Sequence, residues 1–425
     1  MHSIIVGIGR CGQRMAISIP DQVIKNPNLP GLYFSRDLFR LKRIRSITLA
    51  DISDQPLLSS RMLKSIEVRI GVPINTIRLQ ETGGGGVGGR WWISERIAER
   101  EGAEKIINLL DRKGFLQVID TAVIIHSAGG GTGAGTGPVL ANRLNKYFNS
   151  KNGEVSYGLL LSVTALPHED DPIRRLNALS TIGRYDKLVD TIILFDNARW
   201  KLVKKIIGNS KKREMVEPVL LINDIFSRIF LWLNSVDGFL SRRRDHKIEP
   251  KDYEAADFKT LLRADNKTSL SVPFYGEYTI RELYKYKLLF LVLYTILQNS
   301  MVDIDPIHGF RNLLVIIGIP KILKETSKVQ SLITSEELTT MRNYLNKYLR
   351  IYDRSEVLQV YYRPGNKIVI TGLIINPIVR RLLDLETYID EDLSKIKDED
   401  IVDIYQDALD KYKSITSYAR SEVSR

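Results

Sequence analysis

The fold is decided by the stretch Ser127-Ala128-Gly129-Gly130-Gly131-Thr132-Gly133-Ala134-Gly135-Thr136-Gly137, in which six of the last nine residues are glycine. An apolar run typical of a buried strand, residues 122–125, comes before it, and a helical pattern beginning at Pro138 comes after it. Backbone without Cβ atoms can bring its N–H groups close to anionic oxygens, and the positive end of the next helix adds its field. The stretch therefore predicts a phosphate cradle and a nucleotide. The alternative is a flexible Gly/Ser turn, but such turns seldom lie between a buried strand and a helix.

This cradle differs from the two commonest phosphate-binding loops. A P-loop needs G-x-x-x-x-G-K-[ST], with a lysine that reaches the outer phosphates, and a dinucleotide fingerprint needs G-x-G-x-x-G with an acidic residue after the second strand. No lysine follows the glycines here. The order GGGTGAGTG instead resembles the signature of the tubulin/FtsZ superfamily, in which backbone amides and a bound magnesium ion do what the lysine does elsewhere.

Apolar strands alternate with helical patterns in the first half of the chain. The expected strands are 3–7, 46–51, 122–126, 157–163 and 191–195, each followed by a loop and a helix-like segment. This alternation predicts an α/β fold with a Rossmann-like parallel sheet. Ligands of such sheets lie beyond the carboxyl ends of the strands, where the connecting loops meet.

The second half predicts a long central helix, a smaller α+β domain and a C-terminal amphipathic helix. Residues 215–239 are apolar on most sides of a helix, which is typical of burial between layers. Helices are expected over 283–298 and 335–349, and strands over 313–318 and 367–373. The last helix has Ile401, Ile404, Tyr405, Ala408, Leu409 and Tyr412 at helical spacing, to pack on its own domain or on a partner.

At 425 residues the chain is too long for one core and suits two domains. With the resemblance to the tubulin/FtsZ superfamily, we expect a GTP-binding α/β domain (1–213), a central linking helix (214–240), an insertion with a catalytic acidic loop (241–264), an α+β activation domain (265–383) and a C-terminal helical extension (384–425).

Charge and cysteine usage bear on partners and location. The net charge of +12 includes two basic clusters, residues 211–213 and 242–244, which could meet anionic lipid, an acidic partner or nucleic acid, although solvated loops explain them more simply. Nucleic acid is not an expected partner, because no aromatic residues or nucleic-acid-binding motifs accompany the clusters. Cys11 is the only cysteine, and neither a secretory signal nor a stretch near the roughly 20 apolar residues of a membrane span is seen. We expect a cytoplasmic protein without a transmembrane segment.

The resemblance extends to two further loops. Gly9-Arg10-Cys11-Gly12-Gln13-Arg14 resembles the GQCGNQ turn of tubulin, and Thr82-Gly83-Gly84-Gly85-Gly86 with Glu101-Gly102-Ala103-Glu104 is similar to its TGAGN…EGAE stretch. In the family the first turn holds the α- and β-phosphates, the second loop senses the γ-phosphate and the cradle wraps all three. The resemblance therefore implies nucleotide contacts from Gly9, Arg10, Cys11, Gly12, Gln13, Gly84, Gly85, Gly86, Ser127, Gly129, Gly130, Gly131, Thr132 and Gly133.

One of these positions departs from the family. Arg10 replaces a glutamine that helps to hold magnesium, so a direct contact between arginine and phosphate is the alternative there. No side chain is assigned as a metal ligand.

Base and ribose contacts are implied later in the chain. Phe195-Asp196-Asn197 resembles the IDN of tubulin, whose asparagine recognises guanine, and Asn223 begins the central helix where the family keeps a second base-reading residue. Residues 167–171 with Arg174 resemble the ribose and phosphate loop of FtsZ, which implies roles for Asp170 and Arg174. Alone, Asn197 would be a turn residue; its place in this ordered series favours base contact and selection of GTP over ATP.

An acidic element completes the resemblance. Residues 252–260 resemble the NxDxx[DE] loop that, in the family, reaches the γ-phosphate of the neighbouring subunit. Glu254 and Asp257 would then orient and polarise the attacking water, and Asp252 replaces the usual asparagine. Without the family, three acids in six residues indicate an exposed helix start. An insertion before this loop adds three arginines, and Arg243 is a candidate arginine finger.

Together these motifs predict a divergent, archaeal-type tubulin/FtsZ-superfamily protein. The stretches 303–306, 313–318 and 362–372 are more similar to FtsZ and the CetZ group than to tubulin. The resemblance implies GTP/GDP and Mg²⁺ as cofactors, head-to-tail polymerisation with itself and GTP hydrolysis between subunits. A second tubulin-like subunit and a membrane anchor are further candidate partners.

Two alternatives remain open at this point. The first is a structural filament protein with little or no GTPase activity, because Arg10, Ser53 and Asp252 stand where the family prefers other residues. The second is a basic scaffold that binds DNA or membrane through its lysine and arginine clusters.

Overall fold

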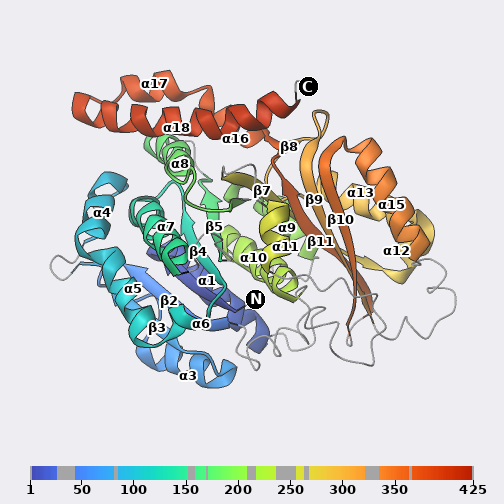
Figure 1. Ribbon diagram of the computed structural model, residues 1–425, viewed down its shortest axis with the longest axis horizontal. Helices are drawn as coiled ribbons and strands as arrows, with labels where there is room; N and C mark the ends of the chain where they lie inside the picture. The colour runs from blue at the N-terminus through green and yellow to red at the C-terminus, as the bar shows by residue number, and fades with distance from the viewer. Residues whose placement is uncertain are drawn as a thin grey trace.

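A ten-stranded sheet runs through the molecule in the order β10-β9-β11-β7-β6-β5-β4-β1-β2-β3 (Figure 1). The computed structural model describes residues 2–25, 44–80, 85–151, 158–168, 171–207, 217–235, 255–262, 268–320, 335–362 and 366–423. The strands of this sheet are β1 Ser3–Ile8, β2 Ile44–Asp51, β3 Ile74–Arg78, β4 Thr121–Ser127, β5 Leu159–Leu166, β6 Thr191–Asp196, β7 Ser269–Thr279, β9 Phe310–Pro320, β10 Ile351–Tyr362 and β11 Lys367–Ile375. β8 Ile304–Asp305 and β12 Ile378–Val379 form a separate pair.

Strands β1 to β7 of this sheet pair in parallel, which confirms the predicted α/β class. β11 is antiparallel to both β7 and β9, and β9 pairs in parallel with β10. The two halves meet where β6 pairs with β7 over three residues only, Thr191–Ile193 against Ser269–Ser271. The domain boundaries expected from the sequence remain a prediction.

Helices cover both faces of the sheet. In the first half they are α1 Gly9–Lys25, α3 Ser60–Ile70, α4 Trp91–Ile97, the π-helix η1 Ala98–Gly102, α5 Ala103–Arg112, α6 Phe115–Val118, α7 Thr132–Lys151, α8 Pro172–Arg184, the 3₁₀ turn η2 Asn197–Arg199 and α9 Trp200–Ile207. The others are α10 Pro218–Ser235, α11 Ala255–Leu262, α12 Ile280–Tyr286, α13 Leu288–Gln298, α15 Ser335–Tyr348, α16 Arg380–Glu386, α17 Ile389–Ser394 and α18 Glu399–Val423.

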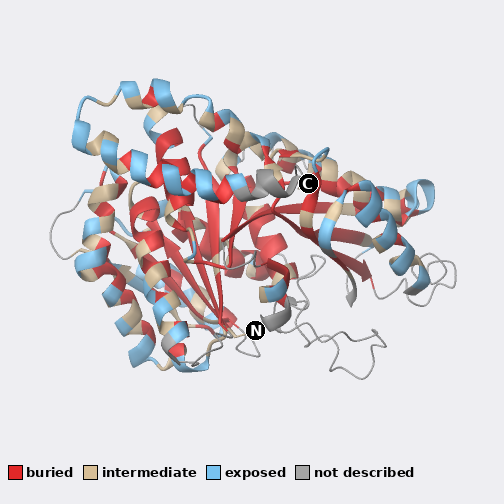
Figure 2. Cartoon of the chain, turned by 45° about the horizontal axis from the view of Figure 1, so that its top comes forward, coloured by how far each residue is buried: buried red, intermediate tan, exposed pale blue. Residues whose placement is uncertain are grey.

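The strands divide the core into two layers because their side chains alternate between the faces. In β1, Ile4 and Val6 join the cluster under α7 and α8, whereas Ile5 joins the cluster under α1 and α10. Every residue of β1 is buried, as expected for a parallel strand covered on both sides. Figure 2 shows this arrangement, with buried strands inside and exposed outer faces on the helices.

The predicted central helix is α10, which is largely buried, as its apolar sequence predicts. Residues 283–298, expected to be one helix, are divided. A capping box between Thr279 and Glu282 starts α12 early, and Lys287 at φ 61° ends it before α13 begins.

The C-terminal amphipathic helix is α18, and it packs against α8 of its own chain. Tyr405, Ala408, Leu409 and Tyr412 are buried in this contact region, which confirms packing in cis. No helix in the described parts of the chain is long and apolar enough to cross a membrane.

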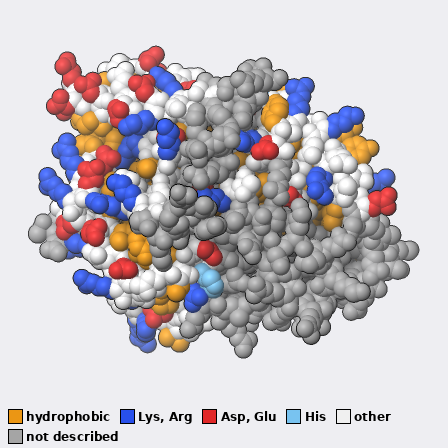
Figure 3. All heavy atoms as spheres, viewed as in Figure 1, with side chains coloured by type: hydrophobic (Ala, Val, Ile, Leu, Met, Phe, Trp, Pro, Cys, Tyr) orange, Lys and Arg blue, Asp and Glu red, His pale blue; other side chains and the backbone are white. Residues whose placement is uncertain are grey.

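Acidic and basic side chains are interspersed over the described helices on the face seen in Figure 3. The two basic clusters, 211–213 and 242–244, lie outside the described residues. Whether those clusters bind a partner therefore stays a prediction.

Candidate functional site

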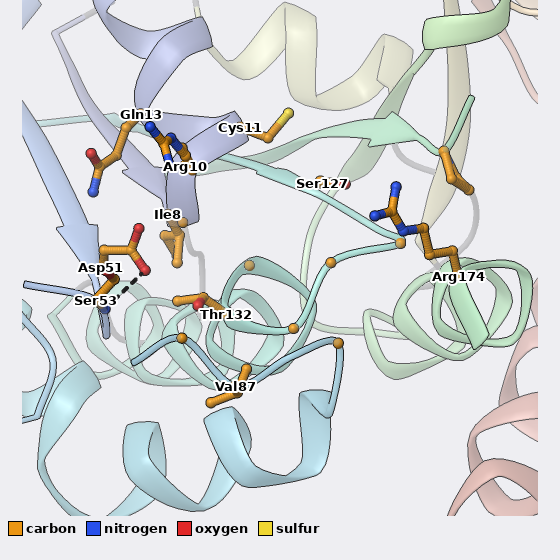
Figure 4. A pocket seen from close by; sticks show the side chains of 18 of the residues that line it. Ile8, Arg10, Cys11, Gln13, Asp51, Ser53, Val87, Ser127, Thr132 and Arg174 are labelled. Atoms are coloured by element: carbon orange, nitrogen blue, oxygen red, sulfur yellow. Dashed lines mark hydrogen bonds between the residues drawn. The ribbon is translucent and has the colours of Figure 1, made fainter. Parts of the chain in front are cut away.

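A pocket of about 980 Å³ opens where the loops after β1, β2, β4, β5 and β6 meet (Figure 4). All five strands present their carboxyl ends there, the position at which parallel α/β sheets bind ligands. The predicted residues that line it are Gly9, Arg10, Cys11, Gln13, Gly85, Gly86, Ser127, Gly129, Gly130, Gly131, Thr132, Gly133, Arg174 and Asn197.

Several glycines are required because the loops around the pocket touch backbone to backbone. Gly9 has φ 67°, and a Cβ there would lie 3.3 Å from the amide nitrogen of Gly133. A Cβ on Gly131 would collide with Val87 and lie 3.1 Å from the amide nitrogen of Gly89. The first turn, the second glycine-rich loop and the cradle therefore form one packed unit.

Three other glycines have room for a side chain. A Cβ on Gly85 or Gly86 would have no atom within 4 Å, and one on Gly130 would come no closer than 3.9 Å to Ser127. All three line the pocket. Their lack of a side chain leaves backbone open toward the cavity, where the first turn of α7 also begins.

Arg174 is positioned by the start of α8. Asp171 caps this helix by accepting a hydrogen bond from the Arg174 amide at 3.1 Å, and Pro172 follows at the first helical position. Arg174 also packs beside the cradle, since a Cβ on Gly129 would lie 3.3 Å from its Cβ. In Figure 4 it lies across the cavity from Arg10 and Asp51. Two guanidinium groups therefore face the pocket from separate elements.

Asp51, the last residue of β2, is a pocket residue that the sequence prediction missed. Its carboxylate accepts hydrogen bonds from the amides of Ile52 at 2.8 Å and Ser53 at 3.4 Å. Burial raises its pKa, and these bonds together with the charge of Arg10 oppose the shift. The sequence could have indicated this role, because an acidic residue at the carboxyl end of a predicted parallel strand lies where such sheets bind ligands. The other pocket residues that were not assigned include Ser53, Gln55, Val87, Gly88, Gly89, Asp171 and Glu217.

Cys11 and Asn197 also line the pocket. Burial raises the pKa of the Cys11 thiol to about 11, so it stays uncharged at neutral pH. Asn197 begins η2, which Asp196 caps by accepting a hydrogen bond from the Ala198 amide at 2.8 Å. Arg381 Nε lies 3.7 Å from the Asp196 carboxylate and so joins α16 to this corner of the site.

The remaining predicted residues lie elsewhere or are not described. Gly12 is buried in α1, where a Cβ would collide with the Ile125 carbonyl oxygen. Asn223 is buried in α10 and is not among the lining residues; its carbonyl accepts a hydrogen bond from Ser18 at 3.2 Å. Gly84, Asp170, Asp252 and Glu254 lie outside the described residues, and Asp257 lies in α11 with its side chain outside the description.

α11 lies at the amino ends of the strands, opposite the carboxyl ends at which the pocket opens. Lys259 on α11 donates a hydrogen bond to the carbonyl of Gly158 at 2.7 Å, and its Nζ lies 3.9 Å from Asp190. Gly158 and Asp190 directly precede β5 and β6, so both mark the amino ends of strands. β5 spans about 23 Å at ~3.3 Å per residue, which separates α11 from loops at the carboxyl ends.

Comparisons with known proteins agree with this architecture. Residues 2–205 match the family described as tubulin/FtsZ family, GTPase domain. The tubulin-like protein CetZ of Pyrococcus furiosus is 25% identical over 237 residues, which cover 53% of this chain and 54% of the relative. CetZ1 of Haloferax volcanii is 33% identical over 119 residues, 28% of each chain. The match thus spans about half the length of the first of these curated relatives and less of the second.

Solved structures show the same fold over most of the chain. A GTPγS-bound protofilament of CetZ2 from Haloferax volcanii superimposes with a TM-score of 0.66 at 15% identity, covering 93% of this chain and 99% of that one. An empty FtsZ dimer from M. jannaschii gives a TM-score of 0.57 at 18% identity, covering 88% of this chain and 87% of that one. At these identities the likeness establishes the fold alone.

Proposed function

Because residues 2–205 of the chain belong to the tubulin/FtsZ family through its GTPase domain, we propose that the pocket binds GTP and GDP. The chain then assembles head to tail into protofilaments and hydrolyses GTP at the contact between subunits. GTPγS and GDP are named for the CetZ2 protofilament and for a CetZ1 monomer of the same fold, which supports guanine nucleotides as the ligand class.

The observation that carries the proposal is a pocket of about 980 Å³ whose wall includes glycine backbone open to the cavity. Gly85, Gly86 and Gly130 face the cavity with no packing reason to lack a side chain. The amino terminus of α7 and the guanidinium groups of Arg10 and Arg174 add positive potential to the same cavity. A triphosphate can thus be held without a P-loop lysine.

The residues present fit a magnesium ion that is shared with the phosphates. The described residues hold no cluster of three or more His, Cys, Asp or Glu side chains suited to a metal. Magnesium, however, is usually held by one or two carboxylates together with substrate phosphates. Asp51 supplies such a carboxylate on the pocket wall, held by backbone amides. When bound, the ion supplies positive charge at the phosphate oxygens.

The position of α11 supports a catalytic site shared between subunits. Since α11 is bound to the amino ends of β5 and β6, Asp257 is remote from the pocket of its own chain. In a head-to-tail contact the amino-end face of one subunit meets the carboxyl-end face of the next. Asp252, Glu254 and Asp257 of one molecule would then orient water at the nucleotide of its neighbour.

Two measurements test this proposal. Calorimetry with magnesium should show binding of GTP, with ATP binding at least tenfold more weakly, and absence of guanine-nucleotide binding would refute the proposal. GTP turnover per molecule should also rise with protein concentration. Turnover that does not depend on concentration would contradict a shared site.

A mixing experiment identifies the shared residues. Gly130→Ala protein should bind GTP about tenfold or more weakly but keep Asp257, and Asp257→Asn protein should keep the pocket but lack the acid. Each alone should turn over GTP slowly, and the mixture should recover part of the wild-type rate. A mixture no faster than the mean of its components would argue against the exchange of acids between subunits.

The second candidate function is a filament that hydrolyses little GTP. It is supported by Arg10 and Ser53 at pocket positions where the family prefers other residues. Sedimentation with GTP but without matching phosphate release would favour it. A cytoplasmic location is part of both proposals.

A further inference from the structure

Asn177 on α8 holds both glycine-rich loops of the pocket. Its side-chain amide nitrogen donates to the carbonyl of Gly89 at 2.8 Å and to the carbonyl of Gly129 at 3.3 Å. Gly89 belongs to the second glycine-rich loop and Gly129 to the cradle, and both line the pocket. Asn177 is fully buried, so water does not compete for these bonds. One side chain therefore links the two loops, in addition to the packing of Gly131 against Val87 and Gly89.

The C-terminal helix fixes the orientation of Asn177. The hydroxyl of Tyr405 on α18 donates to Asn177 Oδ1 at 2.5 Å, across 228 residues of sequence. Burial raises the pKa of Tyr405, so the hydroxyl keeps the proton that it donates. A flipped amide would bring Oδ1 against two carbonyl oxygens and its NH₂ group against a donor. The tyrosine hydroxyl thus specifies the amide orientation that holds the loops.

Tyr405 also touches the segment that follows the second loop. Its ring makes edge contacts with Trp91 and Trp92, with centroids 6.0 Å apart in each pair. These tryptophans are the first two residues of α4 and come directly after residues 85–90. Tyr405 therefore reaches this loop by two routes, through Asn177 and through the start of α4.

α18 is seated firmly enough to transmit such a constraint. A Cβ on Gly183 of α8 would collide with the Ala408 carbonyl oxygen and lie 2.6 Å from the Tyr412 nitrogen, so the two helices nearly touch along their backbones. Near the other end of α8, Arg175 forms a buried two-bond pair with Asp392 of α17, each bond 2.7 Å long. The packing leaves little freedom between α8 and the C-terminal helices.

We propose that the C-terminal helix α18 sets the nucleotide affinity of the pocket through the chain Tyr405–Asn177–Gly89/Gly129. Tyr405 and Asn177 are positioning residues, since their bonds end on loop carbonyls. This inference rests on the proposed nucleotide binding. With these hydrogen bonds intact, the two loops are held at the spacing that the ligand needs. Without them, the loops adopt other arrangements for part of the time, and the affinity for nucleotide falls in proportion to the fraction of molecules in those arrangements.

The coupling must act in both directions. If the seating of α18 tightens nucleotide binding, nucleotide binding tightens the seating of α18 by the same factor. A partner that lifts α18 would therefore promote nucleotide release. In hydrogen exchange, the amides around Tyr405 should exchange more slowly when GTP is present.

The test compares Tyr405→Phe with Tyr412→Phe. Tyr412 lies on the same helix, is equally buried and donates its hydroxyl to Glu386 at 2.6 Å, away from the pocket loops. Each variant loses a hydroxyl hydrogen bond made by a buried ring, a bond that is buried for Tyr405 and part-buried for Tyr412, so both should lower the melting temperature. Tyr405→Phe should weaken GTP binding about fivefold in calorimetry with magnesium, as expected for a loss near 1 kcal/mol. Tyr412→Phe should change the dissociation constant by less than about twofold.

Other outcomes separate this inference from the proposed function. Wild-type protein that fails to bind GTP would refute both. Wild-type protein that binds GTP, with equal affinities for the two variants and no change in exchange around Tyr405, would refute only the coupling. In a double-mutant cycle, Asn177→Ala should remove most of the effect of Tyr405→Phe, and strictly additive effects would overturn the proposed chain.

Discussion

The Tyr185 hydroxyl lies 2.7 Å from Nε2 of His126, directly beneath the glycine-rich cradle. The two rings stack with centroids 5.4 Å apart, and both residues are fully buried. Gly137 is needed for this contact, because a Cβ there would collide with the Tyr185 hydroxyl. A buried polar pair thus packs against Gly133 and Gly137 of the cradle.

Protonation of His126 should destabilise the protein in mild acid. Burial lowers the pKa of His126 from 6.5 to about 4, so the unfolded chain takes up this proton first as the pH falls. Stability is therefore lost as the pH drops from 6.5 to 4, by roughly 3 kcal/mol from this group. Urea unfolding at several pH values should show a smaller loss for His126→Asn than for wild type. Equal losses would contradict the assignment.

Two glycines of the cradle should respond differently to alanine. A Cβ on Gly133 would lie 2.8 Å from the His126 Cβ and 3.2 Å from the Ile8 carbonyl oxygen, whereas one on Gly130 has room. Gly133→Ala should lower the free energy of unfolding by about 1–3 kcal/mol. Gly130→Ala should leave it within about 0.5 kcal/mol and weaken GTP binding about tenfold or more. Denaturant melts without nucleotide and calorimetry with GTP check the pair, and a large stability loss in Gly130→Ala would be inconsistent with the open cradle.

Asp51 should account for the effect of magnesium on nucleotide binding. Asp51→Asn removes the carboxylate from the pocket wall, so magnesium should no longer tighten GTP binding, a change of about tenfold. Asp54 is the control, because it is exposed and pairs with Arg78 at 3.4 Å. Asp54→Asn should keep the difference in affinity measured with magnesium and with a chelator. Retention of that difference in Asp51→Asn would exclude Asp51 as the ligand.

The buried pair between Arg175 and Asp392 should dominate the attachment of the C-terminal helices. Asp392→Ala removes the carboxylate that neutralises the buried guanidinium and should cost about 3–5 kcal/mol of unfolding free energy. The exposed pair of Lys411 and Asp407 is the matched control, and Asp407→Ala should cost less than about 1 kcal/mol. Chemical denaturation measures both, and similar costs would show that the buried pair is not what secures these helices.

The sequence predicts local features of this molecule well. The cradle, its strand and α7 are contiguous and carry a distinctive glycine order, so the position of the pocket follows from residues 122–138. β7 escaped prediction because Pro273 and Gly276 are typical of breaks. Pro273 is tolerated because the pairing of β7 with β6 ends at Ser271, so its missing N–H costs no bond on that side.

Long-range relationships could not be predicted in the same way. Tyr405 and Asn177 are 228 residues apart, and neither belongs to a motif. Asp51 becomes a site residue only because β2 pairs beside β1, which brings its end next to Arg10. Such contacts depend on strand order, and a single sequence contains no direct signal of that order.

The short ladder between β6 and β7 has a mechanical consequence. Three residue pairs join the two halves of the sheet there, whereas nine pairs join β11 to β7. We expect the sheet to bend most easily along this line, because few ladder hydrogen bonds resist rotation of one half against the other there. In the head-to-tail polymer proposed above, small rotations along Thr191–Ile193 would add up from subunit to subunit and so contribute to the curvature of the filament.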